Sequence, residues 1–566
     1  MNVKDKVLLA LMPFWTPLIP PMGIACLKSF LKQHGYAVIT TDANMEKEFR
    51  DLYNHYFETL KEIVPGDKRG NFYSIGQDVL HNHLMAHLNY TGESRYIELV
   101  RILIEKTFYT ESSEESITRL NRTVASFYSC LQDYVLRLLQ RHEPTVLGLS
   151  VCSGTLPASL FAFRLCKEKY PYIRTVMGGG IFCDQLAVGT PNFQILLEKT
   201  RDFIDTFIIG EGEILLLKWL RGELPEGLRF YTRGDIEGEN QFLDLTAVEI
   251  PDFSDFELRH YPYLSAYTSR SCPHQCHFCS DTVMWGKYRK KPPARVVSEL
   301  TRLYHEHGYQ LFMMSDLLLN PSMSGLVEEF SKTNTSIYWD GCLRAEEPVC
   351  HIENTMSWRR GGFYKARIGC ESGSERVLQL MNKNISVEQI KAALSSLAYA
   401  GIQTTTYWVI GYPGEQEEDF QETLDLITAL RDDIYEAECR PFYYYLTGQA
   451  NSPAWEKEKK RCALYPDWAE EMLLFQTWIL EGEPTREETY RRVQRFEQHC
   501  RNLGISNPYT MADIYAADER WQKLHRNAVP SLLKLRNKNT YIDECKRLEE
   551  VSFIPGIPKE DGDFVF

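Results

Sequence analysis

Three cysteines lie close together near the middle of the chain. Cys272, Cys276 and Cys279 stand in the segment SRSCPHQCHFCSD, separated by three and then two residues. Soft thiolates at this spacing suit zinc or an iron–sulfur cluster. A structural zinc needs a fourth ligand, which His274 or His277 would have to supply, although such sites usually combine two separated pairs of ligands. A four-iron cluster held by three cysteines instead leaves one iron open to an exchangeable ligand, which implies chemistry.

The cysteine spacing, with an aromatic residue before the last cysteine, resembles the cluster loop of the radical S-adenosylmethionine (SAM) enzymes. In that family the open iron of a [4Fe-4S] cluster binds the amino and carboxylate groups of SAM. The reduced cluster then cleaves SAM and releases a 5'-deoxyadenosyl radical. The resemblance implies that Cys272, Cys276 and Cys279 hold the cluster and that Phe278 packs near the adenine.

Two later segments continue this resemblance, which covers about residues 258–450. In ARIGCESGSERVLQLMNKNISVEQI, Glu371 and Ser372 follow a predicted strand, where a carboxylate and a hydroxyl would meet the ammonium or ribose of SAM. The alternative is that Glu371 caps the next helix. In YWVIGYPGEQEEDF, Gly411 and Pro413 shape a tight strand-to-helix turn that lets the backbone approach the cofactor.

Two charged residues stand at the expected catalytic rim. Asp316 ends the second strand of this region and Arg344 follows the third. An arginine pairs with a carboxylate through two parallel hydrogen bonds, which fits the methionine end of SAM. A surface salt bridge is the alternative for each residue.

Small and hydroxyl-bearing residues follow several predicted strands nearer the N-terminus, at the edge where doubly wound sheets bind ligands. The segments VLGLSVCSGT, VMGGG and IIGEGE resemble loops of the cobalamin-binding domain that precedes the radical SAM domain in one large branch of the family. The residues expected to contact cobalamin are Ser150, Ser153, Thr155, Gly178, Gly179, Gly180, Gly210, Glu211 and Gly212. The motif Asp-x-His-x-x-Gly is absent after the first strand, so no lower cobalt ligand is named. A packing domain without a cofactor is the alternative.

The elements that must position these residues are an alternation of strands and helices. KVLLALMPF and YAVITTD read as buried strands around a helix, and TVLGLSV, IRTVMGGG and DTFIIGEGE continue the pattern. The pattern predicts a doubly wound, Rossmann-like parallel sheet over residues 1–225. Long charged and aromatic stretches at about 45–142 predict a helical insertion within it.

A second alternating run follows a polar linker at 226–257. Its six predicted βα units, over 258–450, favour a partial (βα)6 TIM-like barrel, whose chemistry would lie at the carboxyl ends of the strands. Residues 451–566 are predicted to form a helical C-terminal domain. The chain as a whole is therefore expected to be an α/β protein.

The amino-acid composition limits the classes of partner and the cellular compartment that we expect for this chain. The 566 residues include 63 Lys and Arg against 77 Asp and Glu, for a formal charge of -14, which argues against nucleic acid as a partner. An uncharged stretch at 7–27 contains Pro13, Pro17, Pro20 and Pro21, which would break a membrane-spanning helix. Fifteen cysteines without a convincing export signal indicate a reducing compartment, so we expect a cytoplasmic protein that does not contact membranes.

The resemblance implies a cobalamin-dependent radical SAM enzyme that methylates an unactivated carbon of a natural-product or peptide precursor. The expected cofactors are a [4Fe-4S] cluster, SAM and cobalamin, and the expected partners are a small-molecule, peptide or carrier-bound substrate and an electron donor such as flavodoxin or ferredoxin. One alternative is a rearrangement, ring contraction or cyclisation without methyl transfer. Another is a non-catalytic iron–sulfur or corrinoid carrier. The oligomeric state does not follow from the sequence.

Overall fold

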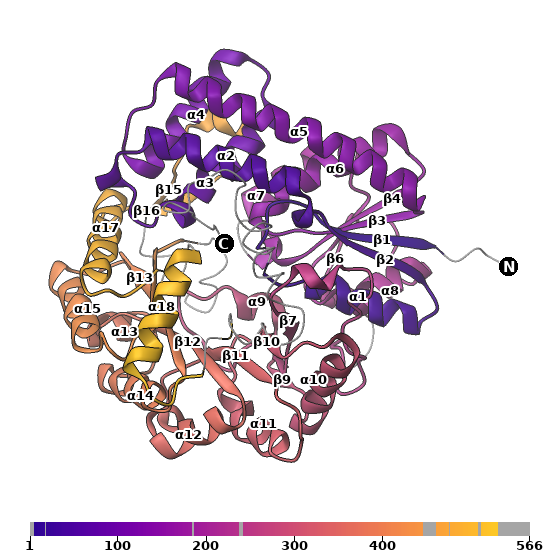
Figure 1. Ribbon diagram of the computed structural model, residues 1–566. Coiled ribbons are helices and arrows are strands. Elements are labelled where there is room, and N and C mark those ends of the chain that lie inside the picture. Colours follow the sequence, from indigo (N-terminus) through magenta and orange to yellow (C-terminus); the bar gives the residue numbers. More distant parts are fainter. Residues whose placement is uncertain are drawn as a thin grey trace.

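Two six-stranded parallel sheets organise the chain (Figure 1). The structure is a computed structural model that describes residues 5–16, 18–183, 186–236, 241–444, 460–474, 476–507, 511–529 and 532. Along the chain, helices lie between the successive strands of each sheet and cover it, as expected for an α/β protein. The aromatic and charged segment at 445–459 and the residues after 532 lie outside the described residues.

The N-terminal sheet has the strand order β2-β1-β3-β4-β5-β6, with every neighbouring pair parallel. Its strands are β1 (Lys6–Leu11), β2 (Ala37–Asp42), β3 (Val146–Ser150), β4 (Arg174–Gly178), β5 (Thr206–Ile208) and β6 (Phe230–Tyr231). The chain leaves β1 toward one edge and leaves β3 toward the other, which makes the carboxyl ends of β1 and β3 a topological switch point. The doubly wound prediction is confirmed, and the sheet also takes in β6, which lies within the stretch expected to be a linker.

Helices of the N-terminal part pack on this sheet and on one another. They are α1 (Met22–Gln33), α6 (Leu156–Lys169), α7 (Pro191–Lys199) and α8 (Gly212–Arg221). The helices α1 and α8 contact each other beside the strands. Strand residues such as Val7 and Leu8 are fully buried, because a parallel sheet is covered on both faces.

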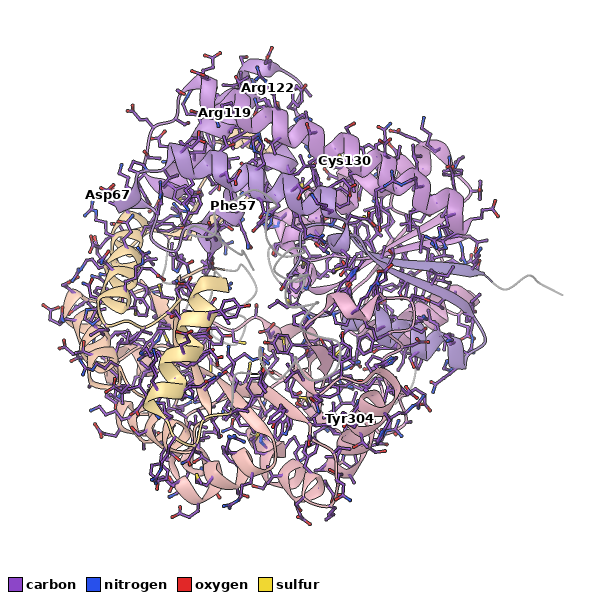
Figure 2. The ribbon with its side chains drawn as sticks, in the orientation of Figure 1. Phe57, Asp67, Arg119, Arg122, Cys130 and Tyr304 are labelled. Carbon is purple, nitrogen blue, oxygen red and sulfur yellow. The ribbon has the colours of Figure 1, made fainter. Side chains whose placement is uncertain are left out.

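The helical insertion joins β2 to β3, as the sequence predicts. It consists of α2 (Lys47–Ile63), α3 (Phe72–Asn89), α4 (Glu93–Phe108) and α5 (Glu114–His142). Ser113 caps α5 by accepting a hydrogen bond from the Ser116 backbone N–H at 3.2 Å. Figure 2 shows Phe57 within this bundle and Arg119 on its outer side, where Arg119 pairs with Glu62. The insertion docks through contacts of α5 and α3 with α6.

The second sheet has the order β14-β13-β12-β11-β10-β7 and does not close into a full barrel. Its strands are β7 (Leu264–Ala266), β10 (Leu311–Met314), β11 (Tyr338–Leu343), β12 (Phe363–Glu371), β13 (Gln403–Ile410) and β14 (Glu436–Pro441). The helices between them are α10 (Pro293–His307), α11 (Met323–Phe330), α12 (Ile352–Arg360), α13 (Glu375–Leu380), α14 (Val387–Tyr399) and α15 (Glu417–Ala429). The six predicted βα units therefore form the expected open partial barrel.

A small antiparallel ribbon follows β7. Strand β8 (Ser269–Arg270) pairs with β9 (Arg289–Lys290), and the short helix α9 (Asp281–Trp285) lies between them. This ribbon encloses the three-cysteine segment.

The C-terminal region contacts the other parts of the chain. It contains the antiparallel pair β15 (Arg461–Ala463) and β16 (Trp478–Leu480), then α17 (Arg486–Asn502) and α18 (Met511–Leu524). Arg486 donates hydrogen bonds to the Lys106 carbonyl and the Tyr109 hydroxyl of the insertion. Asn192, at the start of α7, exchanges two hydrogen bonds with the Gln476 backbone. Among the described helices, none is both long enough and apolar enough to cross a bilayer.

A buried lysine attaches the segment between the two sheets to α1. The Nζ atom of Lys28 lies 2.8 Å from an Asp255 carboxylate oxygen and 3.3 Å from an Asp252 carboxylate oxygen, and it donates a hydrogen bond to Ser254. Lys28 is 2% exposed. Lys32, one helical turn later, pairs with the same Asp252 at 2.7 Å but is mostly exposed.

We predict that Lys28→Met lowers the free energy of unfolding by about 2 to 3 kcal/mol. Removing one partner of a buried pair costs about 3 to 5 kcal/mol, and partial exposure of the two carboxylates reduces that cost. Lys32→Met, the matched control, should cost less than about 1 kcal/mol. Urea denaturation followed by circular dichroism measures both, and equal losses would contradict the assigned difference.

Candidate functional site

The cysteine loop leaves β8 through a strained residue. Ser271 has a φ of 72°, in the left-handed region that non-glycine residues rarely adopt, and its hydroxyl donates to the Gly286 carbonyl at 2.6 Å. Such a conformation costs about 1 to 3 kcal/mol and persists where surrounding structure fixes it, often at functional sites. The β8–β9 ribbon fixes it here. The three cysteines that follow are half-buried.

A second loop, residues 380–384, lies across the cysteine loop. The His277 N–H donates to the Met381 carbonyl at 2.9 Å, and the Asn382 side chain donates to the Gln275 carbonyl at 2.8 Å. The Nδ1 atom of His277 also lies 3.1 Å from the Leu380 carbonyl. His274 places Nε2 at 2.9 Å from Glu346. Both histidines thus use ring nitrogens in contacts away from the cysteines, which favours the cluster over zinc.

Two buried cations lie beside the cysteines. Arg344 donates from Nη1 to the Cys276 Sγ at 3.6 Å, and Lys383 lies 5.6 Å above the Phe278 ring. Burial raises the pKa of the Cys272 thiol, and Arg344 and Lys383 oppose that rise. Burial and the nearby Asp281 carboxylate raise the pKa of the Cys279 thiol to about 12. Three soft sulfur donors with cations to offset their negative charge suit the chemistry of an iron–sulfur cluster. In this structure no group of three or more His, Cys, Asp or Glu side chains among the described residues lies close enough together to hold a metal ion.

The structure brings several of the predicted SAM residues together around this loop. Glu371 has a φ of 65° and pairs with the Lys383 Nζ at 2.6 Å. Lys383 therefore contacts both Glu371 and the Phe278 ring. Arg344 contacts the same cysteine loop through Cys276. The alternative in which Glu371 caps the next helix is wrong, because Ser374 occupies the N-cap position of α13.

Two other predicted SAM residues make contacts within the barrel. Asp316 is buried and accepts hydrogen bonds from the Thr268 N–H, the Thr268 hydroxyl and the Ser269 hydroxyl, so it fixes the chain between β7 and β8. Ser372 is buried with its hydroxyl 3.4 Å from that of Thr423 on α15. Their assignment to SAM stays a prediction.

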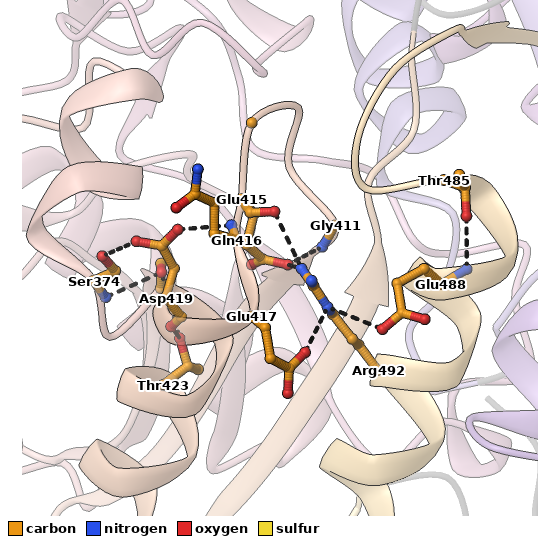
Figure 3. Close-up of polar contacts among 12 residues, drawn as sticks. Ser374, Gly411, Glu415, Gln416, Glu417, Asp419, Thr423, Thr485, Glu488 and Arg492 are labelled. Atoms are coloured by element: carbon orange, nitrogen blue, oxygen red, sulfur yellow. Dashed lines mark hydrogen bonds and ion pairs between the residues drawn. The ribbon is translucent and has the colours of Figure 1, made fainter.

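The turn after β13 is held by a buried ion pair (Figure 3). Glu415 accepts a hydrogen bond from the Gly411 N–H at 2.9 Å and pairs with Arg492 of α17 at 2.8 Å. Burial raises the Glu415 pKa to about 7, against the opposing effect of the guanidinium. Gly411 has a φ of 77°, and a Cβ there would lie 2.1 Å from the Thr489 hydroxyl, so helix α17 requires glycine at this position. Pro413 is half-buried in the same turn.

A cavity of about 330 Å³ lies between the N-terminal sheet and the cysteine loop. Its inner walls are the ends of β1, β3, β4 and β5 and the first turns of α1 and α8, mostly apolar side chains such as Leu9, Ile24 and Leu216. Glycine opens the space: a Cβ on Gly148 would lie 2.7 Å from Leu9, and one on Gly212 would lie 3.3 Å from Leu27. The outer wall belongs to the barrel half of the chain.

Most residues predicted to contact cobalamin line this cavity. They are Ser150, Gly178, Gly179, Gly180, Gly210 and Gly212. Gly179 has a φ of 116°, and a Cβ there would lie 2.3 Å from the Val151 carbonyl oxygen, so no other residue fits. A mostly apolar cavity at a switch point, with several glycines in its lining, fits an aromatic base such as that of the cobalamin nucleotide tail.

The other three predicted cobalamin residues lie elsewhere. Ser153 is exposed in a short turn. Thr155 is buried, and its hydroxyl hydrogen-bonds the Cys152 backbone. Glu211 pairs with Arg270 at 2.8 Å and Arg289 at 2.7 Å, and so joins the two halves of the chain.

A polar face of the insertion, which no pattern in the sequence indicated, approaches both sheets. On α3, Asp78 accepts a hydrogen bond at 3.1 Å from Tyr443, just beyond β14, and burial raises the Asp78 pKa. One turn later, the His81 Nε2 lies 3.1 Å from the position a Cβ on Gly154 would occupy. Burial lowers the His81 pKa to about 4, so its imidazole is neutral at pH 7. The even polar and apolar mixture of α3 offered no sequence signal for this face.

Comparison with known proteins identifies the class. Residues 267–427 match the family model of the radical SAM superfamily, so the chain contains a radical SAM domain. Over most of the chain, the fold is similar to that of cobalamin-dependent radical SAM proteins of known structure. It resembles TsrM, a radical S-adenosylmethionine methyltransferase from Kitasatospora setae solved with cobalamin and a [4Fe-4S] cluster, with a TM-score of 0.56, 12% identity and 88% of each chain covered. It also resembles the cobalamin-dependent SAM radical enzyme OxsB, with a TM-score of 0.50 and 15% identity over 90% of this chain and 62% of that one.

Curated relatives match about half of this chain. An anaerobic magnesium-protoporphyrin IX monomethyl ester cyclase of Rubrivivax gelatinosus is 24% identical over 317 residues, 52% of this chain and 55% of that protein. An uncharacterized methyltransferase of Pyrococcus horikoshii is 24% identical over 310 residues, 51% of this chain and 65% of that protein. A cytidylyl-2-hydroxyethylphosphonate methyltransferase of Streptomyces wedmorensis is 22% identical over 53% of this chain and 64% of that protein. The matched region thus spans about half to two thirds of these relatives.

We predict that Arg492→Met destabilises the protein by about 3 kcal/mol and weakens SAM binding, because it leaves the buried Glu415 without its partner and frees the turn at Gly411. Arg495→Met is the matched control, since Arg495 is half exposed and pairs with the half-exposed Glu417, besides lying over the Phe420 ring. It should cost less than about 1 kcal/mol. Urea denaturation and equilibrium binding of SAM to the anaerobically reconstituted protein measure the two effects. Unchanged SAM affinity in Arg492→Met would contradict a role for the turn in binding.

Proposed function

We propose that this chain is a cobalamin-dependent radical SAM enzyme that methylates an unactivated carbon of a natural-product or peptide precursor. One observation carries the proposal: the glycine-lined cavity at the switch point of the first sheet opens directly against the cysteine loop of the second. Ser271 and Asp281, which flank the cysteine segment, both line that cavity. A corrinoid held there and a cluster held by the loop would therefore be neighbours.

When bound, the cluster with SAM supplies a radical that removes hydrogen from the substrate, and methylcobalamin supplies the methyl group. The residues of this chain position and enclose these groups. Cys272, Cys276 and Cys279 would hold the cluster, and Arg344 and Lys383 would offset its negative charge. The loop at 380–384 covers the cysteine loop and limits the access of water.

The substrate would enter beside the insertion. Helix α3 carries Asp78 beside Tyr443, just beyond β14 of the barrel, and His81 beside Gly154, which follows β3 of the first sheet, so its polar face lies near the carboxyl ends of both sheets. An ionisable carboxyl and a neutral imidazole there suit a polar substrate with hydrogen-bond donors, small, peptidic or carrier-bound. An electron donor such as flavodoxin or ferredoxin would reduce the cluster.

A second function is favoured by the similarity to the magnesium-protoporphyrin ester cyclase. In that case the same residues would hold the same cofactors, and the product would be a cyclised or rearranged substrate without an added methyl group.

We predict that the anaerobically reconstituted protein shows both corrin bands and an iron–sulfur shoulder in its absorption spectrum, and that it cleaves SAM reductively to 5'-deoxyadenosine. Cys276→Ala should lose the shoulder and the cleavage, because it removes a cluster ligand. Methyl-labelled SAM then separates the functions: label in the product supports methylation, and a cyclised or rearranged unlabelled product supports the alternative. Wild-type protein that binds cobalamin and a cluster without cleaving SAM would be a carrier, contrary to the proposal.

We predict that Gly212→Leu weakens cobalamin binding by at least about tenfold, because the new side chain occupies the cavity beside Leu27. Cluster content should not change. Gly92→Leu is the control: Gly92 stands immediately before helix α4, Gly212 is the first residue of α8, and a Cβ on Gly92 meets no atom within 4 Å. Titration of each variant with hydroxocobalamin, followed by absorption, gives the affinities. Equal affinity in Gly212→Leu and wild type would rule out the cavity as the binding site.

A further inference from the structure

The cysteine loop is itself a wall of the cavity. Of the residues that surround the space, Arg270 and Ser271 immediately precede Cys272, while Asp281 and Trp285 of α9 follow Cys279. The Cys279 thiol lies 3.9 Å from the Asp281 carboxylate. Whatever fills the cavity therefore touches the loop at both of its ends.

A buried ionic group connects this wall to the opposite one. Arg270 places Nη2 at 2.6 Å from Glu213 and Nη1 at 2.8 Å from Glu211, and both acidic residues belong to the start of α8. Arg289, the partner of Arg270 in the β8–β9 ribbon, pairs with Glu211 at 2.7 Å. The Arg270 side chain is 8% exposed and that of Glu213 is 5% exposed, so water screens this pair little.

The position of Arg270 also determines how the cysteine loop begins. Its guanidinium lies 5.3 Å from the Trp285 ring and 5.2 Å from the Tyr267 ring, so it is held by aromatic faces as well as by α8. The next residue, Ser271, has the positive φ that turns the chain toward Cys272. A shift of α8 would be passed through this pair to the residue that directs the loop.

We infer that the Arg270–Glu213 pair couples occupation of the cavity to the conformation of the cysteine loop, so that cobalamin and the cluster each raise the affinity of the protein for the other. This inference rests on the proposed function. Coupling of two sites is reciprocal, so the same factor applies in both directions. Glu213 and Arg270 act as positioning residues, since they would influence the cluster through Ser271.

The part of cobalamin that we expect to produce this coupling is its nucleotide tail, because the mostly apolar cavity suits an aromatic base. A cobinamide, which has the corrin ring without the nucleotide, would not fill the cavity. It therefore separates tail binding from corrin binding.

The test compares dissociation constants of hydroxocobalamin and aquacyanocobinamide for the full chain, with and without the reconstituted cluster. We expect the cluster to tighten cobalamin binding about fivefold or more, within the usual range of coupling between sites, and to leave cobinamide binding within about twofold. Glu213→Gln keeps the shape of the side chain but loses its charge. In this variant the dissociation constants of cobalamin measured without and with the cluster should agree within about twofold. Lys28→Met, the control for general destabilisation, breaks a different buried ion pair, on α1, at a residue that does not line the cavity, and should retain the wild-type ratio.

A second measurement avoids reconstitution. In the cluster-free protein, alkylation of Cys272, Cys276 and Cys279 by iodoacetamide, quantified by mass spectrometry, should slow when cobalamin is added and not when cobinamide is added. This comparison uses wild-type protein and decides the matter even if Glu213→Gln fails to fold.

The outcomes are distinct. Cobalamin binding that is equal with and without the cluster overturns the coupling and leaves the proposed function standing. The same tightening for cobinamide also overturns it, because the cavity is then not the route. No binding of either corrinoid overturns both the coupling and the cobalamin-dependent function.

Discussion

The relative position of the N-terminal sheet and the barrel depends on one buried arginine, Arg270, which lies between them. Arg270 belongs to the barrel half, yet its charge is neutralised by Glu211 and Glu213 of the N-terminal half. Separating the halves would leave charged groups without partners in a poorly hydrated interface, which is costly. These ion pairs of Arg270 therefore hold the carboxyl ends of the two parallel sheets near each other. The cavity and the cysteine loop lie where the two ends meet.

Much of the architecture could be predicted because it is encoded locally. Apolar runs of strand length, ended by small or polar residues, marked both sheets, and long charged helical stretches marked the insertion. The cysteine spacing needs no tertiary information, since all three residues lie within one loop. The same holds for Gly179, whose φ of 116° only glycine tolerates readily.

The rest of the site is assembled from residues that are distant in sequence. Lys383 reaches the cysteine loop because the segment after α13 folds back over it, and nothing in MNKN specifies that return. Glu415 holds the turn after β13 only with the help of Arg492, which lies 77 residues later in the chain. The strand β6 was hidden because two residues, Phe230 and Tyr231, are too few to show a pattern. Pairings between segments, rather than patterns within them, set these positions.

The insertion contains more helices than the connection between β2 and β3 requires. A crossover between parallel strands needs only about a dozen residues, and α5, which packs against α6, is long enough for that task. The helices α2, α3 and α4 are additional to it, and α3 carries Asp78 and His81. Natural selection can therefore remodel these three helices without altering the register of either sheet. We therefore expect related chains with this fold to differ more in α2, α3 and α4 than in the length of α5.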